Sequence, residues 1–181
     1  MSVDRSSSPM AADPTPVLEP IAIVGLACRF PGAADPEALW QLVRNGVDAI
    51  TDIPAGRFDA EALYDATPGA RGKIATRQGG FLGQIDGFEP SFFGISPREA
   101  ACIDPQQRLL LEVAWEAFED AGVTQERLVG SETGVFIGMW TSEYEGLMFG
   151  ASSDVDLYVT TGGGRYAASG RVSYAFDLRR L

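Results

Sequence analysis

Two cysteines, Cys28 and Cys102, are the side chains in this sequence best suited to act as nucleophiles. A cysteine thiol has an ordinary pKa of about 8.5, so it needs a basic neighbour to ionise at neutral pH. The 181 residues contain no histidine, and Arg29 is the only basic side chain close to Cys28 in the sequence. Both cysteines are therefore predicted to be reduced and to act as small apolar residues in or near the core.

Paired carboxylates are the second arrangement that could carry chemistry, as a general acid and a general base. Glu112 and Glu116 lie four residues apart in a predicted helix, and Asp154 and Asp156 lie in a predicted loop. Both positions are typical of solvated surface, so a glycosidase-like pair has little support. The lack of histidine also excludes Ser-His-Asp catalysis and most zinc sites. The sequence therefore predicts no catalytic residue, no cofactor-binding residue and no metal ligand.

Two glycine-rich stretches, 25–32 and 160–165, resemble phosphate-binding loops at first sight. The first lacks the G-x-G-x-x-G spacing and has Pro31 where a helix should begin. The second has no Lys-Ser or Lys-Thr after it and no clear strand before it. Each is predicted to be a tight turn. A nucleotide-binding domain stays as an alternative of a different class, which retention on an immobilised nucleotide would support.

The formal net charge of −11 argues against nucleic-acid binding, because contacts with phosphates need a basic surface. The basic residues gather in two places: Arg71, Lys73 and Arg77 in one, and Arg165, Arg171, Arg179 and Arg180 in the other. Each group is interpreted as solvated surface or, alternatively, as a patch that faces an acidic protein partner.

No stretch of 18 or more apolar residues is present that could cross a membrane, and the N-terminus lacks the pattern of a signal peptide. We therefore expect a cytosolic protein without membrane contact. An apolar content of 45% and both signs of charge predict a folded domain with its own core. Residues 1–18, rich in Ser, Pro and Ala, are predicted to be a flexible lead-in.

Residues 104–122 carry the clearest helix pattern in the chain. Asp104 is predicted to cap the helix, Pro105 suits its first position, and Gln107 is predicted to complete a capping box with Asp104. Gly122 is predicted to end the helix in the left-handed conformation. The predicted buried stripe is Leu110, Val113, Ala114, Ala117, Phe118 and Ala121, widened by Leu111 and Trp115. The predicted polar face is Arg108, Glu112, Glu116, Glu119 and Asp120.

Further elements are predicted from shorter patterns. The apolar stretches 21–27 and 134–140 are predicted to be buried strands of a sheet covered by helices. Residues 35–46 are predicted to contain a helix that starts after an Asp-Pro pair, and residues 167–176 a second one. The predicted inner face of the first helix is Leu39, Trp40 and Val43, and a loop is predicted to contain Glu143, Tyr144 and Glu145.

Residues 50–98 are rich in glycine, proline and aromatic side chains and have no long period. A stretch of this length without regular structure is uncommon in a compact domain unless it packs on something. Two interpretations stay open. The stretch either packs on another part of the protein or forms short hairpins and turns with an apolar cluster of its own.

Several strings in this sequence resemble the N-terminal half of the ketosynthase domain of modular polyketide synthases. They are PIAIVGLACRFPGA from Pro20, LWQLVRNGVDAITDIPAGRFD from Leu39, GGFLGQIDGFEPSFFGISPREA from Gly79, DPQQRLLLEVAWEAFEDAG from Asp104, GVFIGMW from Gly134 and ASGRVSYAFDL from Ala168. They follow the family's order, and together they are specific although each alone is weak.

The resemblance implies a thiolase-like α/β fold with layers in the order α-β-α-β-α, of which this chain holds the N-terminal part. It implies that residues 19–181 are the ketosynthase N-terminal region. In the family a nucleophilic cysteine follows soon after the segment that matches residues 169–178, and two histidines come later. This chain reads Arg179-Arg180-Leu181 where relatives usually continue with Gly-Pro. We therefore expect the chain to stop before the nucleophile.

A complete domain of this family joins acyl and malonyl-type units by decarboxylative Claisen condensation. The resemblance implies no resident cofactor, because the substrates arrive on the phosphopantetheine arm of a carrier protein. It implies an acyl carrier protein and a second ketosynthase copy as partners. Since the family's nucleophile and histidines are absent, the chain is predicted to be inactive alone. The alternative is a noncatalytic partner-binding or relic fragment.

Overall fold

The computed structural model describes residues 19–151 and 157–179. The predicted lead-in at 1–18, the pair Asp154 and Asp156, and the basic residue Arg180 lie outside the described residues. The elements are α1 (Pro36–Arg44), β1 (Ile50–Asp52), α2 (Ala60–Leu63), β2 (Gln78–Gly80), the 3-10 helix η1 (Pro90–Phe93), α3 (Pro97–Cys102), α4 (Pro105–Asp120), α5 (Gln125–Leu128), α6 (Glu143–Ala151), α7 (Leu157–Gly163) and α8 (Ala167–Ala175).

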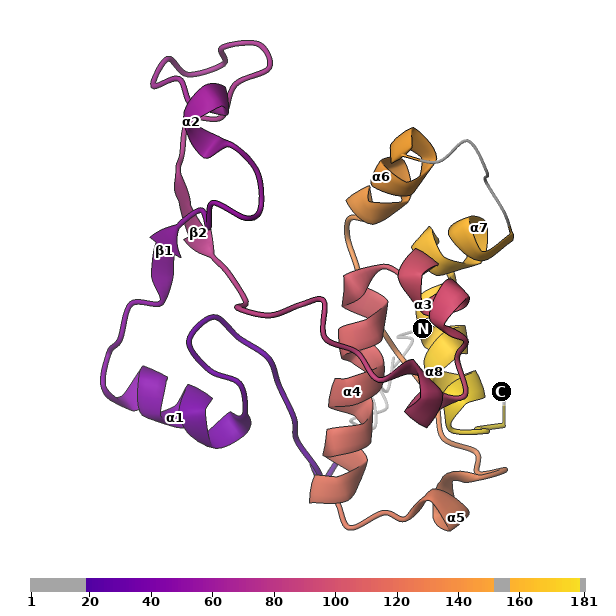
Figure 1. Cartoon of the computed structure of the whole chain (residues 1–181). Helices are drawn as coiled ribbons and strands as arrows, with labels where there is room; N and C mark the ends of the chain where they lie inside the picture. The colour runs from indigo at the N-terminus through magenta and orange to yellow at the C-terminus, as the bar shows by residue number, and fades with distance from the viewer. Residues whose placement is uncertain (1–18, 152–156, 180–181) are drawn as a thin grey trace, which may run out of the picture.

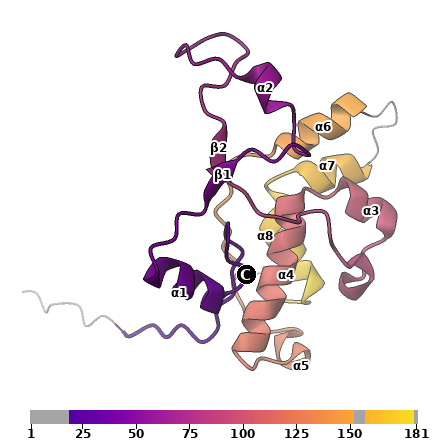
Figure 2. The same ribbon diagram turned by 60° about the vertical axis from the view of Figure 1, so that its left-hand side comes forward.

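The helices α3 to α8 form a body around α4, and the earlier elements form an arm beside it. Figure 1 shows α1, α2 and the β1–β2 pair on the left, connected to the helical body by extended chain. Figure 2, turned by 60°, shows the same separation between α1 and the body. The candidate site lies in the body, so the packing of α4 and α8 determines its shape.

Helix α4 begins and ends as its sequence predicts. The Asp104 carboxylate accepts a hydrogen bond of 2.9 Å from the backbone N–H of Gln106, which caps the helix. At the other end Gly122 has a φ of +64°, a conformation that glycine adopts without steric cost. The N–H of Val123 donates to the carbonyl of Phe118 over 2.9 Å, which completes a Schellman motif.

The capping box predicted from Gln107 is wrong. The Gln107 side chain is 1% exposed, and its amide donates to the carbonyls of Gly162 and Gly164 instead of returning to Asp104. The backbone N–H of Asp104 donates to the Gly162 carbonyl over 3.0 Å. The Gln107 side chain therefore binds buried carbonyls of the segment before α8 and not the backbone N–H of Asp104. Those carbonyls are buried and need a hydrogen-bond donor, and the Gln107 amide lies within reach of them.

The main apolar cluster lies between α4, α5 and α8. Its buried members are Leu111, Leu128, Val172, Phe176 and Leu178. Phe118 contacts Phe176 edge-on at 5.2 Å between ring centroids, and Trp115 stacks on the same ring at 6.2 Å. Burying side chains of this size stabilises a fold by about 1.5–3 kcal/mol each. The cluster thereby fixes α8 against α4.

The faces of α4 differ in part from the prediction. Leu111, placed at the edge of the predicted stripe, is the fully buried residue, while Leu110 and Val113 are only half-buried. Glu119 and Asp120 are exposed, whereas Arg108, Glu112 and Glu116 of the predicted polar face are half-buried. The reason is that different segments contact α4 on different sides. Helix α8 packs on one side, residues 25–29 contact another, and Arg108 lies over the Tyr144 ring.

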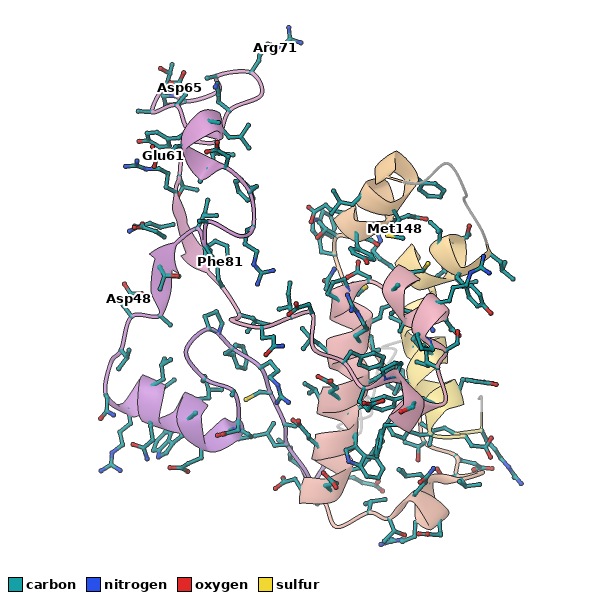
Figure 3. All side chains as sticks on the ribbon, in the orientation of Figure 1. Asp48, Glu61, Asp65, Arg71, Phe81 and Met148 are labelled. Carbon is teal, nitrogen blue, oxygen red and sulfur yellow. The ribbon has the colours of Figure 1, made fainter. Side chains whose placement is uncertain are left out.

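Residues 50–98 contain both of the arrangements considered for them. Strands β1 and β2 form an antiparallel pair with the register Ile50–Gly80, Thr51–Gly79 and Asp52–Gln78. Figure 3 shows Phe81 at the base of this hairpin, away from the helical body. Phe88 and Phe93 instead stack at 5.4 Å and pack against the main apolar cluster. The first part of the stretch is thus a small hairpin arm, and the last part lies over the core.

The two predicted strands are not strands in the structure. Residues 21–27 are extended without regular structure, and Ile21 and Ile23 are 95% and 87% exposed. Residues 134–140 alternate instead: Val135 and Ile137 pack against the main cluster, whereas Phe136 is 93% exposed. Among the described residues the only sheet is β1–β2, so neither segment has a neighbouring strand. A strand needs such a neighbour for its backbone hydrogen bonds.

Three further local predictions are corrected, and two are confirmed. The predicted loop around 143–145 is the start of α6, and the predicted turn at 160–165 contains the end of α7. In α1, Asp35 caps the helix as predicted, but Trp40 and Val43 are exposed because α1 stands away from the helical body (Figure 1). The helix predicted over 167–176 is confirmed as α8.

Candidate functional site

An open cleft of about 810 Å³ lies between α8 and the extended segment that follows α5. Its walls come from 133–136 on one side and from Ser169, Gly170, Ser173 and Tyr174 of α8 on the other. Glu99, Thr161, Arg171 and Arg179 contribute charged and polar side chains to its lining. The cleft therefore has Val135 and Phe136 on one wall, serine and tyrosine hydroxyl groups on the other, and the Glu99–Arg171 ion pair in its lining.

Arg171 is the central residue of a buried polar network beside this cleft. Its Nε donates to the Gln107 side-chain oxygen over 3.0 Å, and its Nη2 donates to the Thr161 carbonyl over 3.0 Å. Its Nη1 forms an ion pair of 3.0 Å with Glu99. The Arg171 side chain is 12% exposed. Both sequence interpretations, solvated surface and partner-facing patch, are therefore wrong for Arg171.

Sequence reasoning missed this network, although one signal pointed to it. Gln107 lies four residues before Leu111, on the same side of α4, where a polar side chain is out of place unless it has partners. Arg171 similarly lies three residues after the buried Ala168 of α8. The partners themselves come from α3 and from the end of α7, which no local pattern connects to α4.

The two cysteines lie as predicted. Cys102 is buried at the end of α3, Cys28 is half-buried, and no disulfide joins them. Arg29, the basic neighbour of Cys28, donates to the backbone carbonyls of Cys28 and Ala34 and to the Glu116 carboxylate. Its guanidinium is therefore held by these three acceptors.

The carboxylates Glu112 and Glu116 are not the solvated pair that the sequence predicts. Glu116 is held by Arg29, and burial raises the pKa of Glu112, with a smaller contribution from the nearby Glu116 charge. The Arg29 and Arg108 charges oppose that shift in the pKa of Glu112. The two glutamates flank an open hollow of about 350 Å³, whose other walls are Arg29, Glu89, Phe92, Phe93 and Trp115. With Glu116 in an ion pair, the two do not form an acid–base pair.

The remaining predicted features lie on the arm or at turns. Residues 30–33 form the predicted tight turn, in which the Phe30 and Ala33 backbones exchange two hydrogen bonds. In the basic group of the arm, Arg77 pairs with Glu61 over 2.8 Å and Lys73 donates to the Ala62 carbonyl, while Arg71 points outward at the tip in Figure 3. Neither glycine-rich stretch has the strand-turn-helix arrangement of a phosphate loop.

Metal ligands and membrane helices are both missing from the described part of the chain. Residues 19–151 and 157–179 hold no group of three or more His, Cys, Asp or Glu side chains placed to bind a metal ion. In the same ranges no helix is both long enough and apolar enough to cross a membrane.

Comparison with known proteins places the chain in a family. Residues 18–179 match the family model described as "Beta-ketoacyl synthase, N-terminal domain". The chain belongs to the β-ketoacyl synthase family. It is 52% identical to the pikromycin polyketide synthase component PikAII of Streptomyces venezuelae over 162 residues, which cover 88% of this chain and 4% of that protein. It is 47% identical to a phenolphthiocerol/phthiocerol polyketide synthase protein of Mycobacterium tuberculosis, over 92% of this chain and 9% of the relative.

Solved ketosynthase structures share its fold. The ketosynthase from module 6 of the bacillaene synthase of Bacillus subtilis 168 superposes with a TM-score of 0.76 and 35% identity, over 87% of this chain and 25% of that one. The oxazolomycin ketosynthase domain OzmH KS7 of Streptomyces albus JA3453 gives a TM-score of 0.73. The predicted thiolase-like fold of a β-ketoacyl synthase is thereby confirmed for its N-terminal part. The chain spans about a quarter of these solved ketosynthase chains and less than a tenth of the two synthases above.

Proposed function

We propose that this chain is the N-terminal scaffold of a polyketide synthase ketosynthase. The complete domain would join acyl and malonyl-type units, carried on carrier proteins, by decarboxylative Claisen condensation. Support comes from the family match over residues 18–179 and from relatives that are polyketide synthases. This chain would position the catalytic residues, which the rest of the domain would supply.

The observation that carries this proposal is that the chain has the fold of a ketosynthase but lacks the side chains that the condensation needs. The reaction needs a thiolate to attack a thioester, donors to stabilise the oxyanion, and imidazoles to assist decarboxylation. The 181 residues contain no histidine. Cys102 is buried, and Cys28 has as its basic neighbour an arginine that is held by Glu116. We therefore expect no condensing activity from the chain alone.

The exposed apolar segments support a scaffold that other residues complete. Ile21, Ile23, Phe136 and Trp140 are each more than four-fifths exposed. Apolar surface of this kind on a folded protein marks a place that another chain or segment covers. The alternating burial of 134–140 is typical of a strand with one packed face. The expected partners are therefore a strand beside its backbone and a layer over its exposed face, both from the rest of the domain.

The substrates and partners follow from the proposed reaction. An acyl carrier protein would deliver each unit on its phosphopantetheine arm, and a second ketosynthase copy would complete a homodimer. No resident cofactor is needed for this chemistry. A noncatalytic role is the second candidate, and the same exposed apolar segments favour it, since any partner that covers them would bind without a reaction.

Acylation by a defined substrate tests the proposal. One sample is the 181-residue chain, and the other is a polypeptide in which residues 1–179 continue into the remainder of the PikAII ketosynthase. Each is mixed with an acyl carrier protein that bears a radiolabelled acyl group. We expect label only on the joined polypeptide, and ketoacyl product once malonyl carrier protein is added. Label transferred to the chain alone would contradict the proposed scaffold role, and a soluble joined polypeptide that takes no label would favour the noncatalytic role.

A further inference from the structure

Three consecutive carbonyl groups before α8 are held by donors from other parts of the chain. The Gly162 carbonyl accepts from the Asp104 backbone N–H at 3.0 Å and from the Gln107 amide at 3.0 Å. The Gly163 carbonyl accepts from the Ser142 hydroxyl, and the Gly164 carbonyl accepts from the Gln107 amide at 3.1 Å. The turn that leads into α8 is thus fixed from the side of α4.

Gln107 makes two of these contacts and also binds α8 itself. Its NH₂ group donates to the two glycine carbonyls, and its oxygen accepts from the Arg171 Nε. The orientation of the carboxamide is forced, because a carbonyl only accepts and a guanidinium only donates. A glutamine at this position uses both donors and its acceptor at once. A hydrocarbon side chain of the same length would satisfy none of the three partners.

The packing around the turn leaves no room for adjustment. A Cβ atom added to Gly162 would overlap the backbone carbonyl of Cys102, so α7 and α3 are in direct contact there. Gln107 is 1% exposed, which excludes water from its partners. If its amide were lost, the carbonyls of Gly162 and Gly164 would lose a buried donor that solvent cannot replace.

The far end of α8 is fixed independently of Gln107. The Asp177 carbonyl accepts from the Gly130 N–H at 2.7 Å, and the Arg179 N–H donates to the Ser131 carbonyl at 2.8 Å. Leu178 is buried in the main cluster. With both ends held, the chain from Gly162 to Arg179 is placed as a unit.

We infer that Gln107 is a positioning residue, whose carboxamide fixes the start of α8 relative to α4. The catalytic consequence rests on the proposed function, in which the segment after α8 bears the nucleophile. Gln107 would then act on the reaction through α8, without contact with the substrate.

Amide hydrogen exchange of the 181-residue chain tests the placement of α8 without any assay of activity. The test variant is Gln107→Met, and Gln106→Met is the matched control, because Gln106 is the exposed neighbour on the same turn. We expect Gln107→Met to speed exchange at 162–170 roughly tenfold or more, with the β1–β2 hairpin and α5 unchanged. The Gln106 amide donates to the Thr141 carbonyl and to the Asp104 carboxylate, and it makes no contact with the glycine carbonyls. Exchange at 162–170 equal to that of Gln106→Met, or faster everywhere alike, would overturn the inference.

A second variant covers the case in which Gln107→Met does not fold. Gln107→Glu keeps the size of the side chain and an acceptor for Arg171, but it turns an oxygen toward the two glycine carbonyls. The Gln107→Glu variant should therefore speed amide exchange at 162–170, while Arg171 of α8 still donates to the side chain at position 107. Exchange at 162–170 equal to wild type in Gln107→Glu would contradict the role of the amide donors.

The polypeptide joined to the PikAII remainder tests the catalytic consequence. Gln107→Met should lower the maximal rate of acylation by roughly tenfold. The concentration of acyl carrier protein that gives half-maximal rate should stay unchanged, because the carrier protein does not contact the buried Gln107 side chain. An unchanged maximal rate would refute the positioning role. If the unsubstituted joined polypeptide takes no acyl group, the proposed function fails, and the exchange experiment still decides whether Gln107 places α8.

Discussion

The Arg29 guanidinium binds both carboxylate oxygens of Glu116, 87 residues further along the chain. The Nη1–Oε2 distance is 2.6 Å, and the same Nη1 donates to the Ala34 carbonyl at 2.8 Å. The backbone N–H of Leu26 donates to the Asp120 carboxylate at 2.9 Å. Polar contacts with α4 therefore hold a segment whose apolar side chains stay exposed. The two-pronged geometry makes the Arg29–Glu116 pair stronger than an ordinary surface ion pair.

Replacement of Arg29 should loosen this attachment measurably. We expect Arg29→Met to lower the free energy of unfolding by about 1 kcal/mol, because the half-buried Glu116 loses its partner. Urea denaturation followed by circular dichroism measures the change. The control is Arg77→Met, which breaks the more exposed pair with Glu61 and should cost clearly less than the loss of the Arg29 pair. Equal losses in the two variants would show that the Arg29 pair has no special strength.

Glu112 should make the fold less stable as pH rises above its ordinary pKa. Burial raises its pKa in the folded chain, so the folded state holds the proton more tightly than the unfolded state does. The stability that the protonated Glu112 carboxyl contributes is present in full below the pKa of Glu112 in the unfolded chain. It is lost as the pH rises through the pKa of Glu112 in the folded chain. Glu112→Gln should therefore stabilise the chain at pH 7 by roughly 0.3 kcal/mol, since solvent screens much of the effect, and should not do so at pH 4. A larger gain in the free energy of unfolding at pH 4 than at pH 7 would contradict a raised pKa for Glu112.

Two helical glycines should respond oppositely to alanine. At Gly162 the added Cβ would overlap the Cys102 carbonyl, so Gly162→Ala should destabilise the chain by roughly 2–3 kcal/mol. At Gly170 in α8 no atom lies within 4 Å of an added Cβ, and Gly170→Ala should stabilise by about 0.5–1 kcal/mol. Thermal denaturation of both variants gives the comparison. Loss of stability in both would mean that α8 packs more closely than described.

Phe136 should matter little in the chain alone and much in a completed domain. It is 93% exposed, so Phe136→Ala should change the free energy of unfolding by less than about 0.5 kcal/mol. In the polypeptide joined to the PikAII remainder the same change should cost about 3 kcal/mol, because the ring becomes buried. Urea denaturation of the four proteins tests this. A small effect in both contexts would mean that nothing covers Phe136.

Local patterns predicted the elements whose partners lie close in sequence. The start and end of α4 followed from Asp104, Pro105 and Gly122, because a cap and a Schellman turn are made by adjacent residues. The core position of Cys102 also followed, since the lack of histidine left the cysteine without an activating base. The strings shared with the family predicted the fold class, because together they cover residues 20–178 in the order that the family has.

Distant partners account for the predictions that failed. Gln107 has the sequence position of a capping residue, but its partners are 55 and 57 residues away. The stretch 21–27 has the composition of a buried strand, and composition does not show whether a neighbouring strand is present. The glutamates of α4 were expected in water because a helix pattern does not show that Arg29 lies beside them.

Amide hydrogen exchange at 21–27 and 134–140 tests most directly whether other residues complete this scaffold. Both segments are extended and have no neighbouring strand among the described residues. Their amides, apart from that of Leu26, which donates to Asp120, should therefore exchange rapidly in the 181-residue chain. In the polypeptide joined to the PikAII remainder, exchange should slow by roughly a hundredfold or more as the strands pair. Slow exchange in the chain alone, or equally fast exchange in the joined polypeptide, would contradict a scaffold completed by the rest of a ketosynthase.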